Sequence, residues 1–420
     1  MAKKSFELQL TAMAHGGYAL GRDDRRMVFV PYTLPGERVL ARQTHEKGQV
    51  TFAAGVKLLE ASADRVYPEC PHFGPGRCWG CQWQHIAYEA QLLLKQDVLA
   101  DQLGRLGGFH DRVIERALEP TIPSPEQWGY NYHMTLDRTA DERLGFLRVD
   151  GRGIEVMVEC YVLHPTLLAL YESLDLDFAG MRRLKLQLGS DGAHMLVMMM
   201  ASEDAPEIAA DFATSVNILL PDNEPVNLIG SAHSLYTVGG RDFRVTAGSS
   251  FRANVAQVDA LVAQVLALLD LTGNEAVLDL YAGVGVFSAF MAARAGLVTL
   301  VESYPPAVTD AEANLAAFDN VDVVEGAVEA VLDVLEGDYQ AAVVDPPPGG
   351  LSQETFNRLI ALGIPRIVYV SSDPASLARD GKKLGKQGYH LLRAQPIDFA
   401  PQTYYIDTVT LFERKSRRKR

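Results

Sequence analysis

The sequence predicts an α/β protein with a doubly wound parallel sheet in its C-terminal part, an OB-like β-barrel at its N-terminus and a central α+β domain. Short strand-like segments separated by turn residues fill the first 60 residues, which is typical of a small barrel. From residue 256 onward, apolar strands alternate with helical segments. We therefore expect domains at 1–60, 61–255 and 256–413, followed by a basic tail at 414–420. A helix over about residues 86–106 is a candidate to pack on the C-terminal domain.

A glycine-rich turn lies in the stretch Val277-Leu-Asp-Leu-Tyr-Ala-Gly-Val-Gly-Val-Phe-Ser288, after an apolar strand. Gly283 and Gly285 let the backbone turn tightly and approach a ligand closely. The helix expected over about residues 286–295 directs its amide groups back at the turn. The next strand ends in Glu302, whose carboxylate can accept both hydroxyls of a ribose. The stretch therefore predicts a nucleoside cofactor, although a tight turn without a ligand is the alternative.

Strands and helices continue to alternate after Glu302, and one strand ends in Asp345-Pro-Pro-Pro348. The last strand, expected at residues 404–412, has no helix after it, so we expect it to insert antiparallel. Such a sheet resembles the class I methyltransferase sheet more than that of a dehydrogenase. The resemblance implies S-adenosylmethionine as the cofactor, rather than a dinucleotide.

The composition is that of an ordinary soluble protein, with 48% hydrophobic and 22% charged residues in 420. No apolar run approaches the roughly 20 residues of a membrane span, and the charged N-terminus does not read as a signal peptide. We therefore expect a cytoplasmic protein that does not associate with membranes. The net charge of −14 argues against a basic body. The first 60 residues nevertheless carry nine Lys and Arg against six Asp and Glu, a net charge of +3.

Two basic segments are candidates for nucleic-acid contacts. Arg22, Arg25 and Arg26 are expected in a loop between two barrel strands, where such barrels contact RNA, although a solvated turn explains them equally well. The segment 414–420 holds six basic residues in seven, which suits phosphate binding or a solubilising tail.

The four cysteines predict a metal or cluster site. Cys70, Cys78 and Cys81 lie within twelve residues, and Cys160 is remote in sequence. A disulfide framework is not expected in a large cytoplasmic protein. Cys78-Trp-Gly-Cys81 places two sulfurs on one turn, as zinc and iron–sulfur sites require, and the spacing does not choose between them. Unrelated buried thiols are the remaining alternative.

The whole chain resembles the RNA uracil-C5 methyltransferases, which make 5-methyluridine in ribosomal and transfer RNA. Residues 1–60 resemble the TRAM domain of that family, an RNA-binding barrel. The other matches cover an iron–sulfur segment, a central domain and a methyltransferase domain, and they comprise Cys70-Pro-His-Phe, Cys78-Trp-Gly-Cys81-Gln-Trp-Gln-His85, Tyr88, Gln91, Lys95, Cys160, Gly145-Phe146, Phe251-Arg-Ala-Asn254, Asp279-Leu-Tyr-Ala-Gly-Val-Gly285, Asp345-Pro-Pro, Ala375-Ser-Leu-Ala-Arg-Asp380 and Pro401-Gln-Thr403.

This resemblance implies a [4Fe-4S] cluster held by the four cysteines, and RNA, ribosomal or transfer, as the partner. It implies S-adenosylmethionine binding by Tyr281, Glu302 and Asp345, with Arg252 where the family has a cofactor-contacting glutamine. Asp407 falls where the family has its proton-abstracting glutamate. We infer no obligate protein partner from the sequence.

One departure concerns the reaction itself, because Ser372 replaces the nucleophilic cysteine of the family motif Ser-Cys-Asn-Pro. Uracil C5 reacts with a sulfonium methyl only after a thiolate adds to C6. A cysteine offers some thiolate at neutral pH, whereas a serine needs a neighbouring base, and no adjacent histidine is visible in the sequence. Asp373-Pro374 is a good helix start, so a strand-to-helix turn without catalysis also explains this segment. Pro348 replaces the arginine of the family's Asp-Pro-Pro-Arg.

Three hypotheses follow. The first is a diverged RNA methyltransferase that uses S-adenosylmethionine, with Ser372 and Asp407 at the catalytic positions. The second is an RNA-binding or assembly factor without turnover. The third is a small-molecule methyltransferase, which suits the acidic body but not the barrel and the basic tail.

Overall fold

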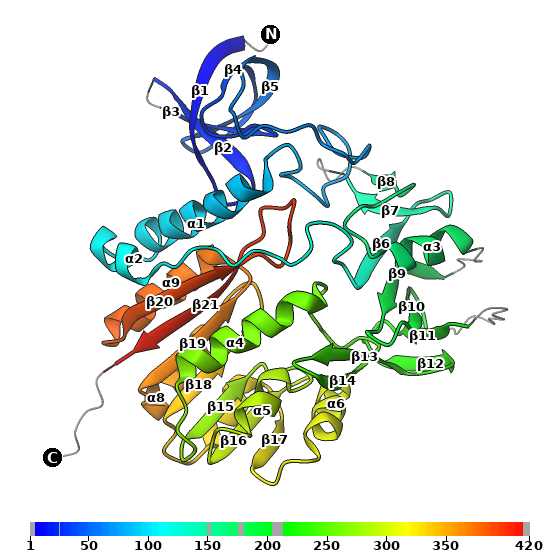
Figure 1. The fold of residues 1–420 in the computed structure, drawn as a ribbon, viewed down its shortest axis with the longest axis vertical. Helices are drawn as coiled ribbons and strands as arrows, with labels where there is room; N and C mark the ends of the chain where they lie inside the picture. Colours follow the sequence, from blue (N-terminus) through cyan, green and yellow to red (C-terminus); the bar gives the residue numbers. More distant parts are fainter. Residues whose placement is uncertain (1–4, 25, 149–152, 175–179, 204–212, 415–420) are drawn as a thin grey trace.

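The computed structural model describes residues 5–24, 26–148, 153–174, 180–203 and 213–414. These residues form an N-terminal barrel, a central antiparallel-rich sheet and a C-terminal doubly wound sheet (Figure 1). The predicted fold class is therefore confirmed. No helix in these described ranges is long and apolar enough to cross a membrane.

The barrel is closed, with strand order β1–β2–β3–β5–β4 and β4 pairing back onto β1. Residues alternate along its strands, so that Leu8, Leu10, Val28 and Val30 fill the interior while their neighbours face outward. The strands are β1 (Ser5–Met13), β2 (Tyr18–Asp23), β3 (Arg26–Pro31), β4 (Arg38–Lys47) and β5 (Val50–Glu60).

Strand β2 was not predicted from the sequence, and the predicted arginine loop is wrong in part. Arg22 lies within β2 and Arg26 begins β3, while Arg25 falls outside the described residues. Gly21 lies inside β2 because a Cβ atom there would stand 2.5 Å from the carbonyl oxygen of Gln9 on β1. This glycine therefore permits the close approach of the two strands.

The central part is a sheet of order β12–β11–β10–β9–β6–β7–β8, covered by α3, with a separate β13–β14 hairpin next to it. Its core is built from leucines and methionines of β6, β9, β10 and α3. The elements are β6 (His133–Arg138), β7 (Leu144–Leu147), β8 (Ile154–Val156), α3 (Pro165–Ser173), β9 (Met181–Leu188), β10 (His194–Met200), β11 (Ser215–Leu219), β12 (Pro225–Ile229), β13 (His233–Val238) and β14 (Arg241–Thr246).

The C-terminal sheet has the order β17–β16–β15–β18–β19–β21–β20, and β21 is antiparallel to both of its neighbours, as predicted. The elements are η1 (Val255–Gln257), α4 (Val258–Leu269), β15 (Ala276–Leu280), α5 (Val286–Met291), β16 (Leu297–Glu302), α6 (Pro305–Leu315), β17 (Val321–Glu325), α7 (Val328–Val334), β18 (Ala341–Val344), α8 (Gln353–Leu362), β19 (Arg366–Ser371), α9 (Pro374–Lys386), β20 (His390–Ile397) and β21 (Asp407–Glu413). Helix α5 is shorter than the 286–295 expected.

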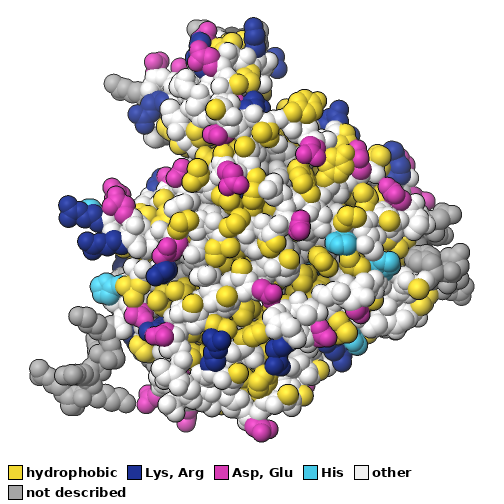
Figure 2. Space-filling model, viewed as in Figure 1, with side chains coloured by type: hydrophobic (Ala, Val, Ile, Leu, Met, Phe, Trp, Pro, Cys, Tyr) yellow, Lys and Arg dark blue, Asp and Glu magenta, His cyan; other side chains and the backbone are white. Residues whose placement is uncertain are grey.

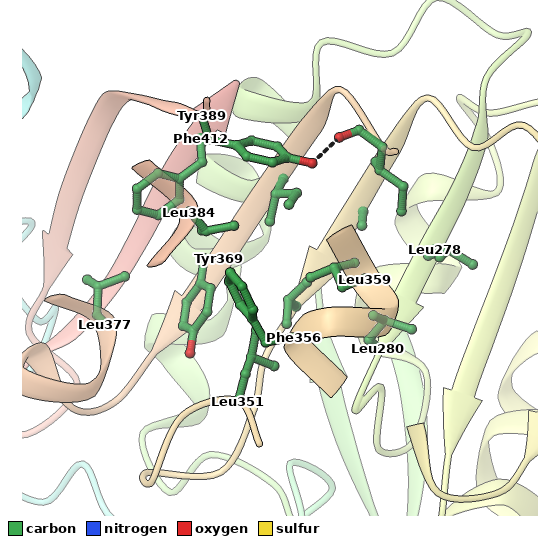
Figure 3. Packing of buried hydrophobic residues seen from close by; sticks show 14 of the residues in the cluster. Leu278, Leu280, Leu351, Phe356, Leu359, Tyr369, Leu377, Leu384, Tyr389 and Phe412 are labelled. Atoms are coloured by element: carbon green, nitrogen blue, oxygen red, sulfur yellow. Dashed lines mark hydrogen bonds between the residues drawn. The ribbon is translucent and has the colours of Figure 1, made fainter. Parts of the chain in front are cut away.

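Apolar clusters cover both faces of this sheet. Helices α4, α5 and α6 pack on one face, and α7, α8 and α9 pack on the other, where Tyr369, Phe356 and Phe412 are fully buried (Figure 3). Burial on both faces explains why the strands read as continuous apolar runs in the sequence.

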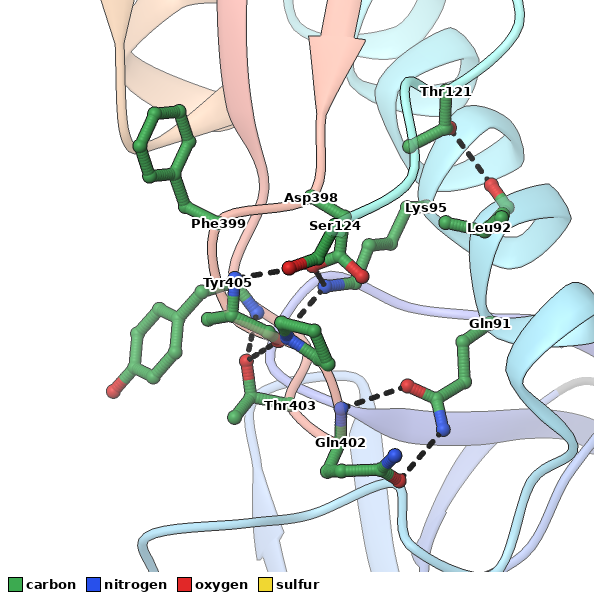
Figure 4. A network of polar contacts seen from close by, with 12 residues as sticks. Gln91, Leu92, Lys95, Thr121, Ser124, Asp398, Phe399, Gln402, Thr403 and Tyr405 are labelled. Atoms are coloured by element: carbon green, nitrogen blue, oxygen red, sulfur yellow. Dashed lines mark hydrogen bonds and ion pairs between the residues drawn. The ribbon is translucent and has the colours of Figure 1, made fainter. Parts of the chain in front are cut away.

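Helix α1 (Tyr88–Arg105) lies between the barrel and the C-terminal sheet, followed by α2 (Asp111–Ala117) (Figure 1). Leu99 and Leu103 of α1 belong to the same apolar cluster as Leu377 and Leu384 of α9. The same face of α1, one and two turns nearer its N-terminus, contacts the 398–406 loop, which joins β20 to β21, through the polar side chains of Gln91 and Lys95 (Figure 4).

Acidic and basic side chains are interspersed over the face that Figure 2 shows. Arg414 stacks over the ring of Tyr389, with its guanidinium carbon 4.9 Å from the ring centre. The rest of the predicted basic tail, 415–420, lies outside the described residues.

Candidate functional site

A cavity of 420 Å³ opens at the carboxyl ends of β15, β16 and β18. The strand order reverses there, because β15 pairs with β16 on one side and β18 on the other. Ligands of open α/β sheets bind at such switch points, and cavities of this size suit small molecules. Five of the predicted cofactor residues line the cavity, namely Arg252, Tyr281, Gly283, Glu302 and Asp345.

The turn after β15 is shaped by residues with positive φ. Tyr281 adopts φ 62°, which is uncommon for a residue with a side chain, and Gly283 and Gly285 adopt 55° and 84°. Gly285 does not line the cavity. A Cβ atom on Gly285 would stand 2.9 Å from Leu315 of α6, so this glycine allows the turn to pack against that helix.

Glu302 is held in place by backbone amides. Its Oε2 accepts from Gly283 N at 2.9 Å, and its Oε1 accepts from Ser303 N at 2.7 Å and Tyr304 N at 2.8 Å. A carboxylate has about four acceptor positions. One position on Oε2 therefore remains for a ligand hydroxyl, so contacts to both ribose hydroxyls would have to share that oxygen or displace an amide.

We expect Glu302→Gln to weaken S-adenosylmethionine binding about tenfold. A neutral amide oxygen accepts a weaker hydrogen bond from a ligand hydroxyl than a carboxylate does, and the new NH₂ group would face a backbone N–H, which is also a donor. Isothermal titration calorimetry measures the dissociation constant. The matched control is Glu325→Gln, since Glu325 is exposed and lies opposite Glu302 in the β16–β17 register. Equal affinities in the two variants would contradict a cofactor role for Glu302.

Arg252 lies between two carboxylates at the edge of this cavity. Its guanidinium donates to Asp407 and, at 3.0 Å and 3.2 Å, to Asp345, and it lies 5.0 Å from the ring centre of Phe399. The Arg252 side chain is 23% exposed and lines the cavity without filling it.

A second cavity, of 360 Å³, lies on the other side of Arg252 and is also lined by Pro348. Both residues line both cavities, so the two spaces adjoin each other at this point. The second cavity brings together Ser372 and Asp407, the predicted catalytic residues, with aromatic side chains of the 398–406 loop. The aromatic and histidine side chains on its wall are His15, Phe399, Tyr404 and Tyr405.

Asp407 is 6% exposed. Burial raises the pKa of its carboxyl group above the ordinary value, Arg252 lowers it and Asp345 raises it. The net direction is upward, so Asp407 binds a proton more readily than a free aspartate does. A raised pKa is what a carboxylate that accepts a proton needs. The ion pair with Arg252 occupies Oδ1 of Asp407.

Ser372 precedes Asp373, which caps helix α9 by accepting from Ser376 N at 2.6 Å. The other oxygen of Asp373 is 3.1 Å from Nε2 of His15, which comes from the barrel. Burial raises the pKa of Asp373, but the hydrogen bonds from His15 and Ser376 outweigh it and hold that pKa well below the usual range. Within the described ranges the Ser372 hydroxyl forms no hydrogen bond.

His15 lies in the same cavity as Ser372, although no histidine is near Ser372 in the sequence. The sequence carried no signal for this pairing, because the barrel and α9 meet only in the folded protein. In the structure His15 is bonded to Asp373 rather than to Ser372. Among the residues that the structure describes, Ser372 therefore has no base in hydrogen-bond contact that would activate its hydroxyl.

The four cysteines converge without forming a closed metal site. No group of three or more Cys, His, Asp or Glu among the described residues is placed to hold a metal ion. Burial and, to a smaller extent, charges on neighbouring thiols raise the pKa of Cys78 to about 12 and that of Cys160 to about 11, against the opposing effect of hydrogen bonds from backbone amides. Burial likewise raises the pKa of Cys81, and charges on Cys160, Cys78 and Cys70 add to the rise. The thiols thus lie within electrostatic range of one another, and as a donor set they fit iron–sulfur or zinc chemistry.

No protein-family model matches the chain. The chain is 34% identical over 429 residues to a protein of Streptomyces avermitilis named an uncharacterized RNA methyltransferase, and the match covers 98% of each. A protein of the same description from Halalkalibacterium halodurans is 31% identical over 98% of this chain and 97% of its own.

Among solved structures, the chain resembles the Pyrococcus abyssi tRNA (uracil-54, C5)-methyltransferase in complex with S-adenosyl-L-homocysteine. The TM-score is 0.72 at 22% identity, and the match covers 96% of this chain and 100% of the other. This likeness shows a common fold. The end-to-end identity to the bacterial proteins shows that the chain belongs to their family, the RNA methyltransferases.

Proposed function

We propose that the protein transfers a methyl group from S-adenosylmethionine to a base of RNA. The observation that carries this proposal is the pair of adjoining cavities that share Arg252 and Pro348 as a wall. The first has the glycine turn and carboxylate of a nucleoside site, and the second has aromatic side chains beside Ser372 and Asp407. A cofactor in one and a base in the other would meet at Arg252.

The charges at the shared wall support a cationic cofactor. Asp345 and Asp407 contribute two carboxylates, and Arg252 neutralises one of them. S-adenosylmethionine, when bound, supplies a methyl group on a positively charged sulfur. The remaining negative charge would favour that sulfur over the neutral sulfur of the product, which helps product release.

We further propose that residues 1–60 act as a TRAM-like RNA-binding barrel and that Cys70, Cys78, Cys81 and Cys160 hold a [4Fe-4S] cluster. The charge interactions among the four thiols, which lie within electrostatic range of one another, support the cluster. When bound, it would tie the cysteine segment to Cys160 of the central part. An anaerobic preparation with iron, acid-labile sulfide and visible absorption would support it, and stoichiometric zinc without iron would contradict it.

The target atom is a further part of the proposal. Attack by uracil C5 needs prior addition of a nucleophile to C6, and no base in the described part of the chain is hydrogen-bonded to the Ser372 hydroxyl to activate it. We therefore propose that uracil C5 is at most a poor target. Nucleoside mass spectrometry of total RNA, with and without the gene, identifies the methylated nucleoside, and an unchanged profile would contradict methyl transfer.

We expect Ser372→Cys to form a covalent complex with RNA that contains 5-fluorouridine, because a thiolate can add to C6 while fluorine prevents removal of the C5 substituent. The wild-type chain is expected to form none. A shift in mobility on a denaturing gel measures the complex.

The matched control for this experiment is Ser371→Cys. Ser371 is buried, its hydroxyl donates to Asp373 O at 3.0 Å, and it does not line the second cavity. Trapping by the wild-type chain would show that Ser372 is already an active nucleophile.

A second candidate function is an RNA-binding or assembly factor without turnover. The double ion pair of Arg252 favours it, since Arg252 occupies one oxygen of Asp407 and opposes the binding of a proton there. Calorimetry separates the two candidates. Binding of RNA without any binding of S-adenosylmethionine would leave the factor as the function.

A further inference from the structure

Aromatic side chains gather on the outer face of the N-terminal barrel. Tyr18 of β2, Phe29 of β3 and Phe52 of β5 are only half-buried, while the residues that flank Phe29 and Phe52 face the barrel interior and are buried. The three strands are neighbours in the barrel, and Phe29 and Phe52 are direct partners in the β3–β5 register. These rings therefore form one surface rather than scattered exposed residues.

Ring contacts join this surface into a continuous series. The ring of His45 stacks on Phe52 with centres 4.5 Å apart and planes 5° from parallel. Phe52 lies 5.4 Å from Phe29 and 5.8 Å from Tyr18. His45 is exposed, so the outer end of the series is open to solvent.

The series continues from the barrel to the second cavity. Tyr18 lies 6.5 Å from Trp79, which is the tryptophan of the Cys78-Trp-Gly-Cys81 turn, and Trp79 lies 6.5 Å from Tyr404. Tyr404 packs at 4.5 Å against Tyr405, and both line the cavity that holds Ser372. The cysteine segment thus places one ring between the barrel and the 398–406 loop. We call the series from His45 to Tyr405 the aromatic track.

Positive charge accompanies the aromatic track. Arg22 lies four residues from Tyr18 on β2 and pairs in register with Met27, two residues before Phe29. Its side chain is exposed, and it has no ion-pair partner in the part of the chain that the structure describes. The first 60 residues carry a net charge of +3 in a protein with a net charge of −14. This charge suits a polyanion along the barrel.

We propose that the aromatic track binds a single-stranded RNA segment adjacent to the methylated base and leads that base into the second cavity. This inference rests on the proposed function and extends it by naming the substrate class. Exposed rings bind unpaired bases, because every base presents a π-face once it leaves a duplex, whereas paired bases are already stacked. The continuity of the track with the cavity is the reason for choosing RNA as its occupant, rather than a protein.

The test uses the full-length protein and a single-stranded RNA of about ten nucleotides that carries one 2-aminopurine, whose fluorescence falls when it stacks. We expect quenching on binding. Phe29→Leu and Phe52→Leu should each weaken binding about tenfold, and the double variant about a hundredfold. Phe29→Trp, which keeps a stacking face, should bind nearly as well as the wild type.

Salt dependence separates stacking from charge. Arg22→Gln should reduce the slope of log affinity against log salt by about one, whereas the leucine variants should leave that slope unchanged. Equal thermal midpoints for the wild type and the leucine variants would exclude loss of folding. If the Phe29→Leu, Phe52→Leu double variant binds the RNA within about twofold of the wild-type affinity and quenches 2-aminopurine equally, the proposal that the aromatic track binds RNA is wrong.

The outcome for methyl transfer is separate. Quenching that depends on Phe29 and Phe52 without any methyl transfer would support the track and overturn only the proposed function. Methyl transfer to this RNA with no quenching at any 2-aminopurine position would overturn only the track. A duplex version of the same RNA should bind about tenfold more weakly than the single strand, and equal binding would also overturn the track.

Discussion

Replacement of Lys95 by methionine is expected to lower the thermal midpoint of unfolding by about 5 °C, which corresponds to a loss of about 3–5 kcal/mol in a chain of 420 residues. Both Lys95 and Asp398 are fully buried, and Nζ of Lys95 donates to Asp398 at 2.6 Å and to Ala400 O at 3.0 Å (Figure 4). Methionine fills a similar volume but leaves the Asp398 carboxylate buried and unpaired. The cost of that uncompensated charge exceeds the value of the pair itself.

Two further variants test this explanation. Lys386→Met removes an exposed lysine of α9 and should change the midpoint by less than about 1 °C. Lys95→Met combined with Asp398→Asn leaves no buried charge, so most of the lost stability should return. A double variant as unstable as the single one would show that packing, rather than charge, explains the loss. Differential scanning calorimetry of the intact chain measures all three midpoints.

Arg252→Gln is expected to increase the preference for S-adenosylmethionine over S-adenosylhomocysteine about tenfold. The two ligands differ at sulfur by one positive charge. In the wild type the positive charge of Arg252 offsets part of the negative charge of Asp345 and Asp407. Without Arg252, both carboxylates attract the positively charged sulfur of S-adenosylmethionine more strongly. Calorimetric titration of each ligand gives the ratio. Arg294→Gln, at an exposed position in the same domain, is the control, and an equal ratio in both variants would contradict a place for the sulfonium beside Arg252.

The same variant should make stability more dependent on pH. Burial already raises the folded-state pKa of Asp407, and Arg252 opposes that rise, so its removal raises this pKa further. The folded state then binds a proton more tightly than the unfolded state does. Stability from this source is present at low pH and is lost as pH rises through the folded pKa. Relative to wild type, the thermal midpoint of Arg252→Gln should therefore fall as the pH rises above about 4, the ordinary pKa of an unfolded aspartate.

The sequence predicted the C-terminal sheet well because its signals are local. Each strand is buried on both faces and reads as an apolar run, and the strand at β21 lacks a helix after it. The turn at Gly283 and the carboxylate of Glu302 follow consecutive strands, so parallel pairing alone brings them to one edge of the sheet.

The second cavity could not be predicted in the same way. His15 and Asp373 are 358 positions apart in the chain and meet only through docking of the barrel on α9. Arg252 is a single residue in a motif, and nothing local shows that it would pair with both Asp345 and Asp407. The alternation of Phe29 and Phe52 with buried neighbours was visible in the sequence, but whether an aromatic residue faces outward depends on the closure of the barrel.

The position of β21 has a consequence for how the protein is made. Among the described strands, β20 pairs only with β21, which lies between it and β19. During synthesis β20 therefore has no place in the sheet until the residues of β21 have left the ribosome. The 398–406 loop is bonded to α1 through Asp398 and Gln402, but its C-terminal end is fixed only when that strand inserts. A nascent chain that stops before Asp407 would leave the edge of β19 unpaired, and an open strand edge promotes aggregation, so translational pausing late in the message should be harmful to it.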